Sequence, residues 1–405
     1  MKVKTKLRTS TVFLLMLLVC SCTSRREQDS ETGTDSLLVA TDALSFVPTA
    51  DTLKNNNTFD GPGLFMAGLS QHDSNSFTSL EREPSWQAFK ISMDSNWNKM
   101  YDGRLIKMKT WQSEHFSSKL NDSLRVFYPF SGPDFLHVYY LFPTAKEYIL
   151  AAMEPIQAAP QLDTLDNSSR TRFLDSLGHS LRDIFSKSYF ITSKMKTDIK
   201  NVKGVLPPLI FFLERTGHEL VSEQFLYLDS TGTEIPTKIT QLHWYKTPGV
   251  KLIFRDRETN EIKTLYYFSI SLSNQGILER PEFEKFLKRN GPYNTFIKSA
   301  SYLLHREIFT DAKKLILQNS ASIFQDDTGV PYRDFKKRLD WNVQLYGEYV
   351  MPVKEFGETR FQSDLDSVYR SSSTRQYLPF SLGYHWGTRK QNYMLLKKSS
   401  TAPTH

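Results

Sequence analysis

The fold of this chain is decided by the segment RVFYPFSGPDFLHVYYLFPTAKEYILAAME, which spans residues 125–154. The segment begins with a short strand pattern, Arg125–Phe130, and ends with a buried apolar strand, Glu147–Met153. Between these strands lie the turn-forming residues 131–134 and an apolar stretch, 135–142, which fits either a short helix or another strand. If the stretch is a helix, the segment forms a βαβ unit, the building block of a parallel sheet.

Strand and helix patterns alternate regularly after residue 262. This alternation is typical of βαβ units and predicts an α/β fold with a Rossmann-like mixed, mainly parallel sheet. The expected strands are 263–272, 294–304, 321–324, 341–352 and 377–386. The expected helices are 281–288, 310–318, 332–339 and 363–370.

A helical N-terminal layer is predicted over residues 84–116, where large apolar side chains recur mostly every three or four residues. Pro84 stands near the start, where a helix tolerates proline, whereas Gly103 weakens the middle and could mark a break. Helical patterns also cover 161–200 and 208–215. We expect these apolar faces to form core rather than the wall of a ligand site.

An antiparallel β insertion is predicted at residues 219–255, because apolar and polar residues alternate there between glycine-containing turns. Together with the strands and helices around it, the insertion predicts one α/β domain over residues 61–395. The last residues, 396–405, are expected to form a disordered tail. The strands expected in the insertion are 219–228, 238–245 and 250–255.

The N-terminus has the pattern of an export signal. Residues 1–21 contain four basic residues and no acidic one, and the apolar run Val12–Val19 is too short to span a membrane. The following residues, Val19-Cys20-Ser21-Cys22, resemble the lipobox of bacterial lipoprotein precursors that are cleaved by signal peptidase II. The resemblance implies cleavage before Cys22 and acylation of its thiol. Residues 22–60, rich in Ser, Thr, Asp and Asn, are then a flexible lipidated tether.

The export signal and the lipobox predict a protein of the cell envelope that its lipid holds at the outer membrane, facing the periplasm. Cys20 and Cys22 are the only cysteines, so a disulfide or a cysteine-based metal site within the mature domain is excluded. The chain is 39% hydrophobic and 13% aromatic, which excludes disorder over the whole length. Its net charge of +7 would fall to about +3 without residues 1–21, too little to indicate nucleic-acid binding.

Polar side chains follow the predicted strands at their carboxyl ends. In a doubly wound sheet these ends share one edge, where ligands bind. We therefore expect a ligand-binding crevice there. The candidate residues are Ser131, Gly132, Asp134, Glu154, His305, Gln325, Asp326 and Asp327.

The first of these positions carry a resemblance to nucleotide-binding Rossmann units, and in particular to the first unit of class I methyltransferases. Glu154 follows Gly132 by 22 residues, close to the spacing between the glycine loop and the ribose-binding acid. The segment 341–386 is similar to the final hairpin of those enzymes. The loop departs from the family pattern, because it has one glycine and because Pro133 lacks a donor N–H. The resemblance implies a methyltransferase-like fold without the activity, since the cofactor is cytoplasmic.

Three functions stay open at this point, and the sequence does not decide whether the domain is an enzyme. The leading hypothesis is a non-catalytic lipoprotein that binds a small ligand or an envelope protein and needs no cofactor or metal. The second is a hydrolase that uses the strand-end carboxylates and a divalent cation. The third is a degenerate methyltransferase-like domain. Asp326-Asp327 could equally be turn residues, and His305 a buried histidine without a function in binding.

Overall fold

The computed structural model describes residues 59–121, 124–191, 197–198, 200–242, 246–336, 340–388 and 390–399. The predicted signal peptide, Cys22 and nearly all of the tether lie outside the described residues. Residues Ala50–His405 form one compact unit, and the cores described below belong to it. None of the helices in the described ranges combines the length and the apolar character needed to cross a membrane.

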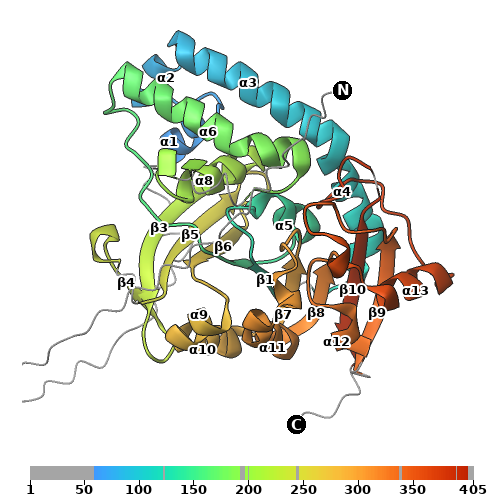
Figure 1. The fold of residues 1–405 in the computed structure, drawn as a ribbon. Helices are drawn as coiled ribbons and strands as arrows, with labels where there is room; N and C mark the ends of the chain where they lie inside the picture. The colour runs from blue at the N-terminus through green and yellow to red at the C-terminus, as the bar shows by residue number, and fades with distance from the viewer. Residues whose placement is uncertain are drawn as a thin grey trace, which may run out of the picture. The chain divides into compact units, whose positions relative to one another are not determined.

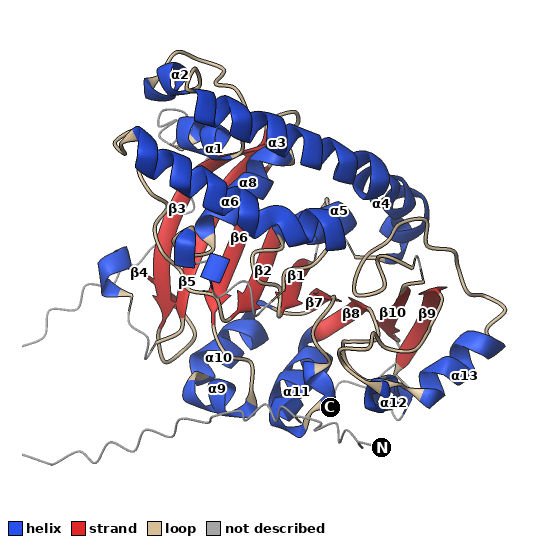
Figure 2. Ribbon diagram, turned by 45° about the horizontal axis from the view of Figure 1, so that its top comes forward, coloured by secondary structure: helices blue, strands red, loops and turns tan. Residues whose placement is uncertain are grey.

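The described unit is built on a mixed sheet of ten strands (Figures 1 and 2), in the order β4-β3-β5-β6-β2-β1-β7-β8-β10-β9. An α/β class was predicted and is confirmed. The strands are β1 Arg125–Pro129, β2 Glu147–Ala152, β3 His218–Leu228, β4 Glu234–Pro236, β5 Pro248–Asp256, β6 Ile262–Ser269, β7 Tyr293–Ile297, β8 Ser320–Gln325, β9 Trp341–Gly347 and β10 Asn392–Lys398.

The middle of the sheet is parallel and both flanks are antiparallel. Strands β6, β2, β1, β7 and β8 run parallel to one another. On one flank β5, β3 and β4 continue the sheet antiparallel, and on the other β10 is antiparallel to both β8 and β9. Four of the nine neighbouring pairs among the described strands are therefore parallel, so the sheet is mixed rather than mainly parallel.

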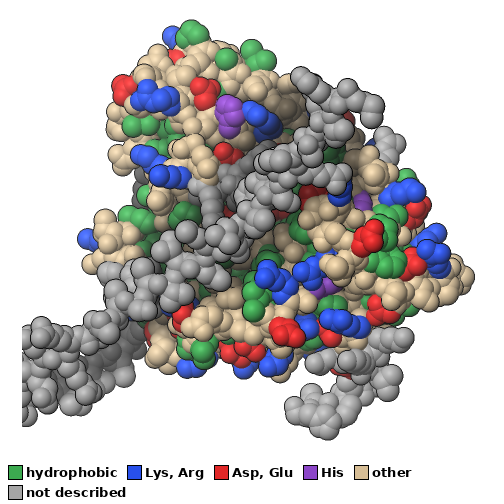
Figure 3. Space-filling model, viewed as in Figure 1, with side chains coloured by type: hydrophobic (Ala, Val, Ile, Leu, Met, Phe, Trp, Pro, Cys, Tyr) green, Lys and Arg blue, Asp and Glu red, His purple; other side chains and the backbone are tan. Residues whose placement is uncertain are grey.

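Helices cover both faces of the sheet (Figure 2). On the face drawn in Figure 3, basic and acidic side chains are interspersed. One face is covered by α1 Asp60–Met66, α2 Ser76–Leu80, α3 Pro84–Met100, α4 Ile106–Trp111, α5 Phe135–Leu141, α6 Asn167–Lys187 and α8 Leu206–Arg215. The other is covered by α9 Asn274–Glu279, α10 Pro281–Asn290, α11 Thr310–Asn319, α12 Tyr332–Lys336 and α13 Ser363–Ser371.

Each face has its own hydrophobic core, and strand alternation divides the side chains between them. Along β1, Val126 and Tyr128 belong to the core on the side of α3, α6 and α8, whereas Phe127 belongs to the core on the side of α9 to α13. The stretch 135–142, which the sequence left as helix or strand, is the helix α5. Its side chains Phe135, Leu136 and Val138 are buried in the first core.

The helical layer at 84–116 continues through Gly103, which lies in the first of two π-helical turns in an otherwise α-helical segment. The turns are Tyr101–Leu105 and Gln112–Phe116. The buried stripe has steps of three or four residues except for two steps of five, from Met100 to Leu105 and from Trp111 to Phe116. A π turn spans five residues where an α turn spans about 3.6, so each long step still ends on the buried face.

Several strand boundaries differ from those predicted. β7 ends at Ile297 rather than at residue 304, and β9 ends at Gly347 rather than at 352. The antiparallel insertion is present, but its middle strand is the short β4, which ends at Pro236, a residue that cannot donate to a strand ladder. The final strand is β10 at 392–398, not 377–386. Part of the expected disordered tail, 396–398, therefore belongs to the sheet.

Candidate functional site at the strand ends

The strand order places a candidate site between β1 and β7. β1 is followed by α5 on one face, whereas β7 is preceded by α9 and α10 on the other (Figures 1 and 2). The two strands are parallel neighbours, so their carboxyl ends meet at the same edge. In open α/β sheets the connections from two such strands lead to opposite faces and leave a crevice for a ligand. We call this position between β1 and β7 the switch point.

Asp134 and Lys298 fill this position. Asp134 is the N-cap of α5, and Lys298 follows the last residue of β7. Lys298 Nζ lies 2.7 Å from Asp134 Oδ2, and both side chains are at most 2% exposed. The ion pair therefore joins the ends of the two strands without contact with water.

Every oxygen of the Asp134 carboxylate has a partner within the protein. Oδ2 also accepts a hydrogen bond from the Tyr128 hydroxyl at 3.1 Å. Oδ1 accepts from the backbone N–H of His137 at 3.2 Å and lies 2.9 Å from His137 Nδ1. Burial would raise the pKa of Asp134, but the contacts with His137 and Lys298 hold this pKa well below its usual range. The carboxylate is therefore ionised and fully engaged.

The neighbouring groups extend this network, in which His137 Nε2 has no partner among the described residues. Burial lowers the pKa of His137 to about 4, so its imidazole is neutral at pH 7 and Nδ1–H can donate to Asp134. Lys298 also donates to the carbonyl oxygen of Ser188, just beyond the end of α6. The Ser188 hydroxyl in turn accepts from the backbone N–H of Gly383 at 2.9 Å. Four separate segments of the chain thus meet over the switch point.

Asp326 and Asp327 form a buried turn beyond β8, as the turn interpretation predicted. Asp326 accepts hydrogen bonds from the N–H and the hydroxyl of Thr328, and from the N–H of Ser299 at 2.8 Å. Asp327 accepts from the Tyr302 hydroxyl at 2.6 Å. Burial raises the pKa of both carboxyl groups, that of Asp326 to about 7.

The backbone around these carboxylates is strained. Seven described residues other than glycine have a positive φ, and five of them stand at or over these strand ends. Such conformations cost on the order of 1–3 kcal/mol each and persist only where the surrounding structure enforces them. They also explain why β7 is shorter than predicted, since the chain turns sharply directly after Lys298. The five residues are Phe130, Ser188, Ser299, Ser301 and Tyr302.

Three further predicted residues, Ser131, Gly132 and Glu154, lie around the loop that precedes α5. Glu154 is half-buried, accepts from the Tyr267 hydroxyl at 3.2 Å, and lies near Gly132. A Cβ atom at Gly132 would lie 3.9 Å from Glu154 Oε1 and 3.8 Å from the ring of Phe190. Ser131 is buried, and its hydroxyl has no partner among the described residues.

Gln325 and His305 bind backbone groups rather than the carboxylates, and the His305 ring lies against the backbone of Asp327 and the ring of Tyr302. The Gln325 amide binds the backbone of Val330 through both of its polar atoms. His305 belongs to a short 3-10 helix rather than to the end of β7, and burial lowers its pKa to about 4. Within the described ranges, no three His, Cys, Asp or Glu side chains are arranged to hold a metal ion. The carboxylates expected to bind a cation are instead bonded to other groups of the chain.

Lys298 and His137 are the residues that sequence analysis missed. His137 stands three residues after Asp134, and this N-cap spacing was visible in the sequence. Lys298 was not recognised as a strand-end residue, because the strand was predicted to extend to residue 304. Comparison of the chain with protein families, with curated proteins and with solved structures found no match.

Proposed function

We propose that this protein is a lipid-anchored envelope protein whose α/β domain binds a ligand or a partner protein and catalyses no reaction. The observation that carries the proposal is the buried pair of Lys298 and Asp134 at the switch point between β1 and β7. A cofactor or substrate at this point would have to displace an ion pair that is already hydrogen-bonded on every side. Removing one partner of a buried pair typically costs about 3–5 kcal/mol.

The loop before α5 supports the same proposal. A nucleotide-type ligand needs free backbone N–H groups and a free acid at these positions. Pro133 has no N–H, and the ring of Phe190 lies beside Gly132. Glu154 already accepts a hydrogen bond from Tyr267. The positions that correspond to a cofactor loop are therefore occupied by the chain itself.

The strand order supports a Rossmann-like ancestry. The order β6-β2-β1-β7-β8 follows the divergence of two sheet halves from β1 that defines a doubly wound sheet. The antiparallel pair β9 and β10 at the end of this series is similar to the final hairpin of class I methyltransferases. We infer a methyltransferase-like scaffold that has lost its cofactor site. The hydrolase alternative is less well supported, because Asp134, Asp326 and Asp327 all have internal partners.

The anchor is proposed from the sequence Val19-Cys20-Ser21-Cys22. Cys22→Ala is expected to abolish incorporation of radiolabelled palmitate and to leave unprocessed precursor in the cell. Cys20→Ala is the matched control and should be processed and labelled normally. Normal cleavage of Cys22→Ala with release of a soluble product would contradict the anchor.

The absence of catalysis is tested by ligand binding to residues 23–405, which keep the whole compact unit. We expect S-adenosylmethionine, NAD and divalent cations to leave the melting temperature unchanged at millimolar concentration. A ligand at about 100 times its Kd would add about 2.7 kcal/mol, which is a shift of a few degrees. A saturable shift that disappears in Glu154→Gln or Asp326→Asn would overturn the proposal.

A further inference from the structure

Two cavities adjoin on the side of the helical layer that faces residues 376–391. The first, of about 690 Å³, lies between the ends of α3 and α6 and the segment 377–391. The second, of about 610 Å³, lies between α4 and residues 376–379. Lys107, Tyr377 and Pro379 line both cavities, so the two adjoin, and we refer to them together as the groove.

The first cavity is cationic. Its lining contains four basic side chains, and no Asp or Glu among the described residues takes part in it. Charges of one sign in a partly enclosed space attract a ligand of the opposite sign. The four basic residues are Lys99, Arg104, Lys107 and Arg182.

Arg104 is the buried member of this set, at 8% exposure. Two of its guanidinium nitrogens donate to the carbonyl oxygens of Ile184 and Ser186 at the end of α6, at 3.2 and 3.4 Å. Its third nitrogen, Nε, is buried without a partner among the described residues, as is Oε1 of Gln391, another lining residue. Because Arg104 Nε is out of reach of solvent, Arg104 acts on the cavity mainly through its positive charge.

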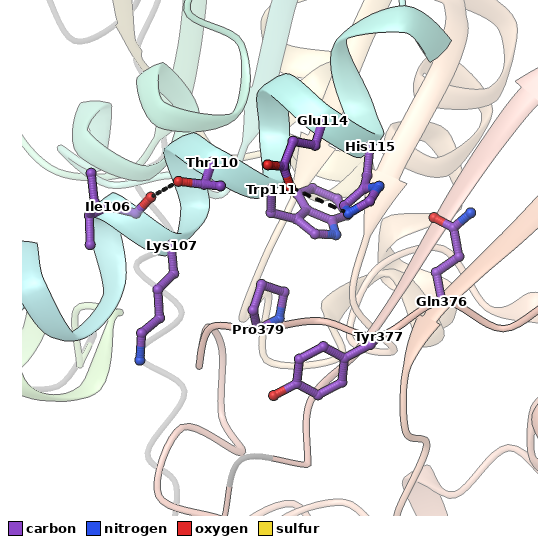
Figure 4. A pocket seen from close by; sticks show the side chains of 9 residues that line it. All are labelled: Ile106, Lys107, Thr110, Trp111, Glu114, His115, Gln376, Tyr377 and Pro379. Carbon is purple, nitrogen blue, oxygen red and sulfur yellow. Dashed lines mark hydrogen bonds and ion pairs between the residues drawn. The ribbon is translucent and has the colours of Figure 1, made fainter.

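The second cavity is mainly apolar. Figure 4 shows Trp111 on the helix and Tyr377 on the opposite segment, with Pro379 between them and Lys107 at one side. Tyr377 is 81% exposed and Ile106 is 37% exposed, although both are large apolar side chains. An exposed apolar wall beside a cationic pocket fits a ligand that has both kinds of surface.

Both π-helical turns lie along this groove. The turn Tyr101–Leu105 contributes Gly103 and Arg104 to the first cavity. The turn Gln112–Phe116 contributes Glu114 and His115 to the second. π turns disrupt α-helical hydrogen bonding and occur frequently at functional sites.

We propose that the groove binds one monomeric amphiphile with an anionic head. A carboxylate or phosphate head would lie against Lys99 and Lys107, close to the charge of Arg104, and an apolar tail would lie along Tyr377 and Pro379. The charge of Arg104 interacts with Asp134, but none of the residues that line the groove belongs to the network at the strand ends. The inference goes beyond the proposed function by naming a class of ligand. Failure at this groove would leave the proposal on the closed switch point unaffected, because different ligands and variants test the two.

The experiment uses residues 23–405 and four probes below their micellar concentrations. Isothermal titration calorimetry is expected to show saturable binding of dodecyl phosphate and laurate. Inorganic phosphate, which has the head alone, and dodecyl maltoside, which has an uncharged head, should bind at least about tenfold more weakly. Equal binding of dodecyl maltoside and dodecyl phosphate would overturn the proposal, as would equal binding of inorganic phosphate.

Variants then locate the site. Gly103→Phe should abolish binding, because a Cβ atom at Gly103 has no neighbour within 4 Å and the ring can enter the cavity that this residue lines. Lys99→Glu combined with Lys107→Glu should weaken dodecyl phosphate about tenfold. Lys109→Glu is the matched control, since Lys109 is exposed on the same helix and lines neither cavity.

The source of the ligand is tested with vesicles of neutral lipid and with vesicles containing one-quarter anionic lipid. We expect no co-sedimentation of the unacylated chain with either, because the groove takes single molecules. Co-sedimentation with anionic vesicles that Lys99→Glu with Lys107→Glu abolishes, without binding of monomeric dodecyl phosphate, would assign the groove to a membrane surface and overturn the proposal. Unchanged binding in both Gly103→Phe and the double variant would also overturn it.

Discussion

Lys298 Nζ lies 2.7 Å from Asp134 Oδ2 and ties the carboxyl end of β7 to the start of α5. The two residues are far apart in the sequence, yet they occupy the point of the sheet at which α/β proteins most often bind ligands. The pair is buried and has hydrogen-bond partners on both sides. An interaction of this kind holds the molecule together at the position where another protein of similar topology would bind a ligand.

Lys298→Ala is expected to destabilise the domain strongly, because it leaves the Asp134 carboxylate buried without its cation. The loss should be about 3–5 kcal/mol, measured by urea unfolding of residues 23–405. Lys298→Met combined with Asp134→Leu should recover a large part of that loss, since it removes both charges. Lys109→Ala, at an exposed position, is the control and should change the free energy of unfolding by less than about 0.5 kcal/mol.

Asp326→Ala is expected to reduce stability by about 1–3 kcal/mol, because Ser299 and Thr328 lose the acceptor of their buried N–H groups. Asp326→Asn should cost less, since its amide oxygen can still accept one of these bonds. Binding of dodecyl phosphate, measured calorimetrically, should be unchanged in both variants. A loss of ligand binding without a loss of stability would show that Asp326 belongs to a binding site rather than to a turn.

His305 should make the domain less stable in acid. Burial, followed by the charge of Arg360, lowers its folded pKa to about 4, below the usual value near 6.5. Between these two values the unfolded chain binds more protons, so the stability contributed by neutral His305 is present above pH 6.5 and is lost as the pH falls to 4. The full effect is about 3 kcal/mol.

The measurement is urea unfolding of the wild type and of His305→Gln at several pH values from 4 to 7. As the pH falls, the free energy of unfolding of the wild type should decrease relative to that of His305→Gln. Other buried groups titrate in the same range, and the subtraction removes their contribution. A pH-independent difference would contradict the lowered pKa of His305.

Gly103→Ala should stabilise the helical layer by about 0.5–1 kcal/mol. Glycine loses more conformational freedom than alanine on folding, and a methyl group at Gly103 would contact no atom within 4 Å. Thermal unfolding should show a rise in melting temperature of about one degree. Gly347→Ala is the contrasting variant, because its φ is positive and its Cβ atom would lie 2.0 Å from the Gln391 carbonyl oxygen. It should lower the melting temperature.

The elements with a clear period were predictable from sequence. The strands on either side of the 131–134 turn were found within one residue at both ends, because their apolar runs are bounded by turn formers. Residues 377–386 show why the same reasoning fails elsewhere. Leu378, Phe380 and Leu382 are buried in alternation, as in a strand, but the segment pairs with no strand among the described residues. Alternation reports burial, and only the tertiary structure decides which segment completes the sheet.

The acidic residues of the candidate site were predictable from sequence, but the partners that occupy their carboxyl groups were not. Asp134, Asp326 and Asp327 stand at strand ends in the sequence, and the sheet brings them to one edge. Their pairing with Lys298, Tyr302 and Asn392 depends on the left-handed residues that end β7 and on the position of β10. Serine and tyrosine give no local signal for a positive φ, so the sharp turn after Lys298 could not be foreseen.

The position of strand β10 determines the stage of synthesis at which the sheet can be completed. This strand follows the nine other described strands in the chain, yet it lies inside the sheet between β8 and β9 and supplies the Asn392 that binds Asp327. A ribosome therefore delivers residues 392–398 after all the other strands. Until they emerge, β8 lacks one neighbour, β9 has no strand to pair with, and the turn at Asp327 lacks a donor. The sheet therefore cannot be completed until β10 has been synthesised.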